Sequence, residues 1–99
     1  MANNLKAYIG FAIKGGKVIF GYDNLIISKK KLELVLISSE QNEKVSSKVM
    51  KFSESKGTQC IKLDFALSDI ITRNCKVLGV TDVNLSQAIL KELKMEIKK

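Results

Sequence analysis

Histidine, proline and tryptophan are absent from this chain of 99 residues, and arginine occurs once, at Arg73. Without histidine, neither a histidine general base nor a Ser–His–Asp triad can form. The two cysteines, Cys60 and Cys75, are too few and too far apart for a disulfide framework or a zinc site. The sequence therefore predicts a protein with reduced thiols that holds no metal and no other cofactor.

Long apolar runs are also lacking. No apolar stretch reaches the length of about 18 residues that a membrane span needs, and the N-terminal segment has no signal-peptide cleavage pattern. We therefore expect no membrane partner, no secretion and a cytoplasmic location. Walker and dinucleotide-binding fingerprints are missing too, because Gly15, Gly16 and Gly21 fit neither spacing.

Cys75 flanks a predicted strand and lies near Arg73 and Lys76 in the sequence. Positive neighbours lower the pKa of a thiol, so an enzymatic alternative would rest on Cys75. Cys60 instead falls on the pattern of a buried strand, where cysteine acts as a small hydrophobic side chain. No base accompanies Cys75 and the acidic residues are scattered, so we predict that the protein is not an enzyme.

Positive charge is what the chain has in excess. Seventeen lysine and arginine residues against ten aspartate and glutamate residues give a net charge of +7. Such an excess favours a polyanionic partner, either nucleic acid or an acidic membrane surface. Because all but one of the basic residues are lysines, part of this charge can also serve only to solvate helix faces.

Apolar periodicity predicts alternating helices and strands in a single domain, residues 1–99. Helices are expected over about 5–13, 22–30, 42–56, a short segment capped by Asp64, and 84–98, and strands over 18–20, 32–38, 60–63 and 76–81. Gly10 falls inside the first helix, where a close helix–sheet contact would explain it. The alternation predicts an α/β fold, a three-layer α/β/α sandwich around a four-stranded mixed, mostly parallel sheet.

The candidate site is the stretch 14–31, KGGKVIFGYDNLIISKKK. A short strand, Gly21 and a helix start together present free backbone N–H groups, which attract anionic atoms. Asp23 and Asn24 occupy the first helical turn, where they either cap the helix or read base edges. Lysines surround this turn in the sequence, although the last three also suit a helix end: Lys14, Lys17, Lys29, Lys30 and Lys31.

The run IGFAIKGGKVIFGYDN, then LELVLIS, then KVLGVTD and a last helix resembles a known superfamily. It is that of the kink-turn RNA-binding large-subunit ribosomal proteins of the seven-Ae and thirty-e type, and in particular its bacterial YlxQ-like branch. The likeness covers about residues 5–93 and rests on the order and spacing of the segments. It implies a compact α/β/α sandwich that binds a sharply bent RNA internal loop with tandem G·A pairs.

The resemblance also implies which residues contact RNA. The family's Gly-x-Asn-Glu segment, which reads the G·A pairs, corresponds to Gly21, Tyr22, Asp23 and Asn24, and its later loop over the bulged nucleotides to about 68–75. This chain departs from the family in four places, one of which is a second helix and exit that are about two residues shorter. The Asn-Glu pair is Asp23–Asn24, a basic position is Ile27, and the later loop reads LSDIIT without the family's two glycines.

We therefore predict a monomeric RNA-binding protein of ribosomal type, able to associate with the ribosome. The residues expected at RNA are Lys14, Lys17, Lys30 and Lys31 on phosphates, Gly21, Tyr22, Asp23 and Asn24 at base pairs, and Arg73 from the later loop. The departures from the family motivate an alternative, a protein-interaction module that keeps the fold and has lost specific RNA reading.

Overall fold

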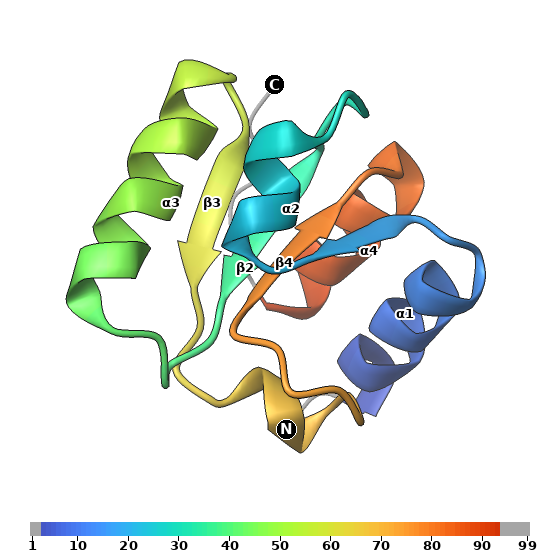
Figure 1. The fold of residues 1–99 in the computed structure, drawn as a ribbon. Helices are drawn as coiled ribbons and strands as arrows, with labels where there is room; N and C mark the ends of the chain where they lie inside the picture. Colours follow the sequence, from blue (N-terminus) through green and yellow to red (C-terminus); the bar gives the residue numbers. More distant parts are fainter. Residues whose placement is uncertain (1–2, 94–99) are drawn as a thin grey trace.

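The computed structural model describes residues 3–93, apart from the side chain of Asn3, and helices alternate with strands along them (Figure 1). The elements are α1 (Asn3–Lys14), β1 (Val18–Phe20), α2 (Tyr22–Ile27), β2 (Leu34–Ile37), α3 (Glu43–Ser55), β3 (Gln59–Lys62), the 3-10 helix η1 (Leu67–Asp69), β4 (Val77–Val80) and α4 (Val83–Glu92). The α/β class is confirmed, and each of the four predicted strands is present.

The strands form one sheet in the order β1-β4-β2-β3. β2 and β3 are parallel, whereas β4 is antiparallel to both of its neighbours, β1 and β2. A mixed sheet is confirmed, but the expectation of a mostly parallel one is wrong, because one of the three pairings is parallel. No crossover helix leads the chain back after β3, so β4 starts at the end of the sheet where β3 stops and runs the opposite way.

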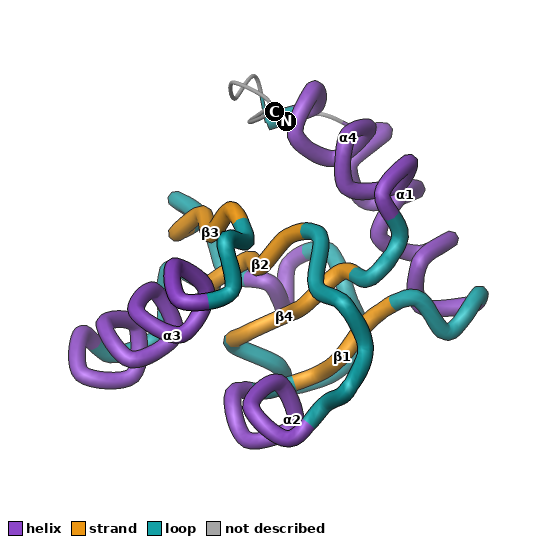
Figure 2. The backbone as a smooth tube through the Cα atoms, turned by 90° about the horizontal axis from the view of Figure 1, so that it is seen from above, coloured by secondary structure: helices purple, strands orange, loops and turns teal. Residues whose placement is uncertain are grey.

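Helices cover both faces of the sheet, α1 and α4 on one side and α2 and α3 on the other (Figure 2). Alternate residues of β2 enter the two cores, Leu34 and Leu36 beside α1 and α4, Val35 and Ile37 beside α2 and α3. All four are fully buried. The three-layer sandwich is confirmed, and the almost continuous apolar run of this strand reflects burial on both faces.

Gly79 in β4 determines how closely α2 approaches the sheet. A Cβ atom at this position would lie 2.5 Å from Cδ2 of Leu25 and 2.9 Å from Cδ2 of Leu32, so the missing side chain makes room for both leucines. The close contact considered as an explanation for Gly10 is absent among the described residues, because a Cβ atom there would meet nothing within 4 Å. The glycine needed for packing is therefore in β4 and not in α1.

Several element ends differ from the prediction. α2 ends at Ile27, earlier than expected, so the three lysines that follow belong to a loop. α3 begins after Asn42, whose side chain accepts a hydrogen bond of 2.8 Å from the N–H of Val45. The helix expected after Asp64 is the single turn η1, which starts later and has no side-chain cap. The predicted extension of the last helix to residue 98 lies outside the described residues.

In residues 3–93, no helix is both long enough and apolar enough to cross a membrane. Over the same range, no cluster of three or more histidine, cysteine, aspartate or glutamate side chains is arranged to hold a metal ion.

Candidate nucleic-acid interface

The strand-to-helix corner at Gly21 has a backbone conformation that favours glycine, with φ 85° and ψ 153°. The N–H of Gly21 donates to the carbonyl of Val77 at 2.9 Å, and its carbonyl accepts from the N–H of Leu25 at 3.1 Å. β4 and the first turn of α2 therefore fix the corner from two sides. Because its N–H is already bonded, Gly21 itself offers no free donor to an anion.

The first turn of α2 carries the other residues predicted to read base pairs. Asn24 donates from Nδ2 to the carbonyl of Phe20 at 2.7 Å, which ties this side chain to the end of β1. Asp23 is exposed, and α2 has no side-chain N-cap, so the alternative role of this pair as helix caps is not seen. Tyr22 is half-buried and packs against the core beneath α2 and α3. Asp23 and Asn24 thus remain the polar side chains exposed at this turn.

The loop between η1 and β4 lies against the same corner. The guanidinium of Arg73 lies over the ring of Phe20, with 4.1 Å between its Cζ atom and the ring centroid. Two segments that are far apart in the sequence are therefore in contact. We name the set Phe20, Gly21, Asp23, Asn24 and Arg73 the glycine corner. Sequence reasoning missed Phe20, for which the available signal was an aromatic residue directly before the glycine that ends the strand.

Strand β4 separates the glycine corner from two of the predicted lysines. Gly21 is bonded to Val77 at the start of β4, whereas the N–H of Thr81, directly after β4, donates to the carbonyl of Lys17 at 2.8 Å. Lys14 closes α1 shortly before Lys17. Both lysines therefore lie at the end of the sheet opposite to the glycine corner.

The lysine loop, Lys29–Lys31, lies at that same end. The N–H of Glu33, just after the loop, donates to the carbonyl of Val80, the last residue of β4, at 2.8 Å. Lys31 and Glu33 approach to 3.8 Å, but the Lys31 side chain is 87% exposed, so this pair contributes little stability. We name Lys14, Lys17 and the lysine loop the basic end.

These lysines cluster around Gly21 in the sequence, but the structure does not gather them around it in space. β1 runs away from the basic end, and α2 runs back towards it (Figure 1). Residues before β1 and after α2 consequently meet at one end, and the turn between them lies at the other. The structure brings Arg73 to Gly21, Asp23 and Asn24, and it separates this group from Lys14, Lys17, Lys30 and Lys31.

The thiol of Cys75 is buried beside the glycine corner, with 7% of the residue exposed. Its Sγ donates to the carbonyl of Val77 at 2.8 Å. Burial raises the pKa of the Cys75 thiol above its ordinary value of 9.0 and outweighs the opposing effects of backbone groups and Arg73. Burial likewise raises the pKa of Cys60. The lowered pKa considered for Cys75 is therefore wrong, because burial has a larger effect on this thiol than the nearby positive charge.

Comparison with known proteins supports the fold. No family model matches this chain, and no curated protein does. A solved structure from Bacillus halodurans C, described as that of a protein with unknown function, superposes with a TM-score of 0.81 at 18% sequence identity. The match covers 95% of this chain and 99% of the other. At this identity the likeness concerns the architecture, which the two proteins share over nearly their whole length.

Proposed function

We propose that this chain is a non-catalytic RNA-binding protein of ribosomal type that recognises structured, kink-turn-like RNA. In this proposal it acts as a monomer in the cytoplasm and associates with the ribosome. The observation that carries the proposal is the contact between Arg73 and Phe20, which holds the later loop against the Gly21 turn. The family resemblance expects RNA contacts from these two segments, and a surface built from both can hold one folded loop of RNA.

Each polar group of the glycine corner has a role in this proposal. The carboxylate of Asp23 and the amide oxygen of Asn24 would accept hydrogen bonds from exocyclic amines of the bases. Arg73 remains exposed at the residue level, so the edge of its guanidinium can donate to a phosphate or to guanine while its face stays on Phe20. The glycine corner would therefore distinguish one RNA structure from another, which the positive charge of the lysines alone would not do.

The basic end would supply phosphate contacts. Lys14, Lys17, Lys30 and Lys31 are exposed, and lysines that neutralise phosphates release counterions, which strengthens binding at low salt. The longest dimension of the protein is 30 Å, so an RNA with a helical arm beyond its loop can reach both ends. An RNA reduced to the loop would therefore keep the corner contacts and lose those of the lysines.

A titration decides between specific and general RNA binding. A standard kink-turn RNA, a plain duplex of equal length and a kink-turn RNA with shortened arms are each titrated at several salt concentrations. We expect the kink-turn to bind more tightly than the duplex, and the shortened RNA to have a weaker salt dependence. Equal affinity for the kink-turn and the duplex would refute the kink-turn proposal.

One observation favours the alternative, a protein-interaction module. Ile26 and Ile27, the last two residues of α2, are 44% and 74% exposed, and an exposed apolar pair suits a protein partner better than RNA. Purification without copurifying nucleic acid, together with a stable protein partner in a pulldown that Ile27→Ser abolishes, would establish this alternative. RNA binding that Ile27→Ser leaves unchanged, with no such partner, would exclude it.

A further inference from the structure

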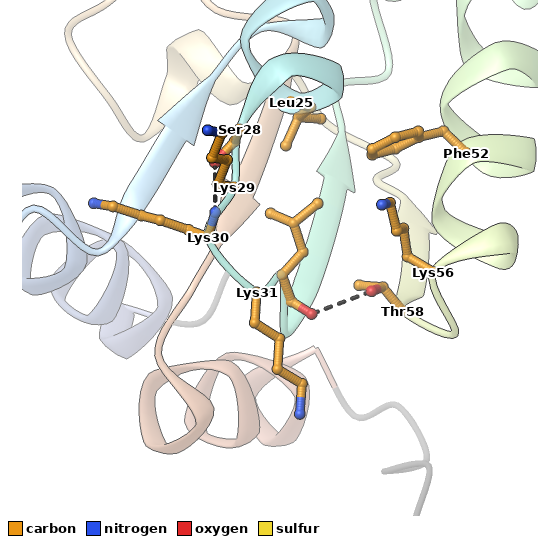
Figure 3. A pocket seen from close by; sticks show the side chains of 9 residues that line it. Leu25, Ser28, Lys29, Lys30, Lys31, Phe52, Lys56 and Thr58 are labelled. Atoms are coloured by element: carbon orange, nitrogen blue, oxygen red, sulfur yellow. Dashed lines mark hydrogen bonds between the residues drawn. The ribbon is translucent and has the colours of Figure 1, made fainter.

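A groove of about 470 Å³ opens between the lysine loop and the C-terminal end of α3. Its volume lies within the range of about 300–1,000 Å³ that small-molecule sites occupy. Figure 3 shows Leu25 of α2 and Phe52 of α3 on opposite sides of the groove, and Lys30 and Lys31 extending outward from its rim. The groove is at the basic end, and none of the residues of the glycine corner lines it.

Two hydrogen bonds fix the shape of this groove. Thr58 donates from Oγ1 to the carbonyl of Leu32 at 3.1 Å, which joins the start of β3 to the segment that leads into β2. Ser28 accepts at its Oγ from the N–H of Lys30 at 3.1 Å, which tightens the turn of the lysine loop. Side-chain to backbone hydrogen bonds therefore hold part of the wall of this groove.

The charge around the groove is largely uncompensated. Four lysines line it: Lys29, Lys30, Lys31 and Lys56. Lys31 alone among them has a salt bridge in the part of the chain that the structure describes, the weak one with Glu33. A concave surface lined by charges of one sign raises the local potential and attracts counter-ions of the opposite sign. The ligand of this groove should be an anion.

The floor of the groove adds a second requirement, an apolar or aromatic part in the ligand. Leu25 and Leu32 are buried beneath the groove, with 1% and 8% of each residue exposed, so the half-buried ring of Phe52 provides most of the accessible apolar surface. The ammonium of Lys56 lies 5.7 Å from the centroid of that ring, so a positive charge stands next to an aromatic face. A planar aromatic group packed on this floor would hold an attached anion within reach of Lys56 and the lysine loop.

We propose that this groove binds a nucleotide, with the base against the ring of Phe52 and the phosphate among Lys29, Lys30 and Lys56. Base–aromatic stacking combined with lysine–phosphate contacts is a combination that single-stranded nucleic acid binding uses repeatedly. The ligand is either a free mononucleotide or one unpaired nucleotide of a bound RNA. The second source rests on the RNA-binding function proposed above; the first does not.

The test follows the amide spectrum of the full chain by NMR during titration. The probes are adenosine 5′-monophosphate, inorganic phosphate, a short single-stranded oligoribonucleotide and an acidic peptide that contains phenylalanine. We expect the mononucleotide and the oligonucleotide to shift the signals of residues 28–32 and Thr58, with inorganic phosphate producing far smaller changes. Binding of the oligonucleotide much more tightly than the mononucleotide identifies RNA as the source, and equal binding identifies the free nucleotide.

Matched variants separate the groove from general charge. Lys29→Gln with Lys56→Gln removes two charges at the groove, and Lys44→Gln with Lys48→Gln removes two from exposed positions in the other half of α3. We expect the first pair to weaken nucleotide binding about tenfold and the second to leave it nearly unchanged. Phe52→Leu, which keeps the site apolar, should abolish the preference for mononucleotide over inorganic phosphate, provided that its thermal unfolding remains cooperative.

Three outcomes overturn the proposal. They are equal shifts with inorganic phosphate and mononucleotide, equal weakening by the two lysine pairs, and shifts produced by the acidic peptide but not by the mononucleotide. The last outcome would make the groove a protein-docking site. Arg73→Lys is included as a variant of the glycine corner. If the protein binds the mononucleotide but not kink-turn RNA, the proposed function is refuted and the groove proposal stands. If it binds kink-turn RNA but not the mononucleotide, the groove proposal alone is refuted.

Discussion

The guanidinium of Arg73 lies 4.1 Å from the centre of the Phe20 ring and thereby joins the loop before β4 to the end of β1. The chain has a single arginine, and the fold places it on the aromatic residue next to Gly21. A planar guanidinium can stack and donate at the same time, whereas the compact ammonium of lysine does not reproduce this arrangement.

Arg73→Lys should therefore weaken binding of kink-turn RNA even though it keeps the charge. We expect a loss of about tenfold or more in affinity, since a good bidentate base contact contributes about 1–3 kcal/mol. The measurement is the dissociation constant at fixed salt. Lys76→Gln is the control, because it removes an exposed charge near the same loop. A smaller effect from Arg73→Lys than from Lys76→Gln would mean that charge, and not stacking, is what the RNA uses.

Stability should respond to the same contact in a smaller way. Arg73→Ala removes a cation–π interaction at an exposed position, which contributes about 0.5–1 kcal/mol. We expect the free energy of unfolding in urea to fall by that amount with an unchanged dependence on urea concentration. Arg73→Ala in a Phe20→Leu background should then cost less than in the original chain. Equal costs in both backgrounds would show that the stacking contributes no stability.

Gly79→Ala should destabilise the fold by about 1–3 kcal/mol, because the added methyl group overlaps Leu25 and Leu32 and forces α2 away from the sheet. Gly10→Ala is the matched control. Its Cβ atom meets nothing within 4 Å, and alanine favours a helix over glycine by about 1 kcal/mol, so this variant should be more stable than the original. Chemical denaturation of both variants measures the difference. A neutral Gly79→Ala would mean that α2 shifts without cost.

Ser38→Ala should also be destabilising, through a buried hydrogen bond. The Oγ of Ser38 is fully buried and accepts from the N–H of Leu67 at 3.0 Å, which anchors η1 to the end of β2. Loss of the acceptor leaves a buried N–H without a partner, at a cost of about 1–3 kcal/mol. The neighbouring exposed Ser39→Ala is the control and should change stability by less than about 0.5 kcal/mol. Amide hydrogen exchange at Leu67 should accelerate in the first variant, and unchanged exchange there would contradict the anchoring role.

The sequence was sufficient for the strands and the layered architecture, and insufficient for the order and direction of the strands. β1 over Val18–Phe20 and the buried β2 follow from local apolar patterns, because those patterns record which faces are covered. No local sequence pattern indicates that β4 lies between β1 and β2, because contacts between distant residues determine the strand order. The alternation of strands and helices suggested parallel neighbours, and β4 runs antiparallel to both of its own.

The same limit applied to the candidate site. Lys17 and Gly21 are close in sequence, but they flank β1 and therefore lie at opposite ends of the sheet, and no periodicity indicates that separation. Arg73 and Phe20 are distant in sequence and in contact in space. The groove at Phe52 and Lys56 escaped prediction for a similar reason, because their positions near the end of α3 resemble those of an ordinary core residue and a solvated lysine. The sequence could indicate which residues are candidates for a binding site, whereas the fold was needed to show which of them lie together.

The buried thiols give a prediction about pH. Because burial raises the pKa of Cys75 in the folded state above its ordinary value of 9.0, the neutral thiol favours folding. This contribution is fully present below pH 9 and is lost as the pH rises through the folded-state pKa, since the unfolded chain ionises first. We expect Cys75→Ala to be less stable at pH 7 and to lose less of its remaining stability than the original between pH 8 and pH 10. Urea unfolding at each pH measures both effects.

Alkylation gives an independent readout of the same thiol. At pH 8 the folded protein should react with iodoacetamide more slowly at Cys75 than at the half-buried Cys60, and both should react more slowly than in urea. Peptide mass analysis after timed quenching separates the two sites. Rapid modification of Cys75 in the folded state at pH 7 would mean that Arg73 stabilises a thiolate, and a nucleophilic role would then have to be reconsidered. Slow modification, with RNA binding unchanged in Cys75→Ser, leaves this thiol a purely structural role beneath the glycine corner.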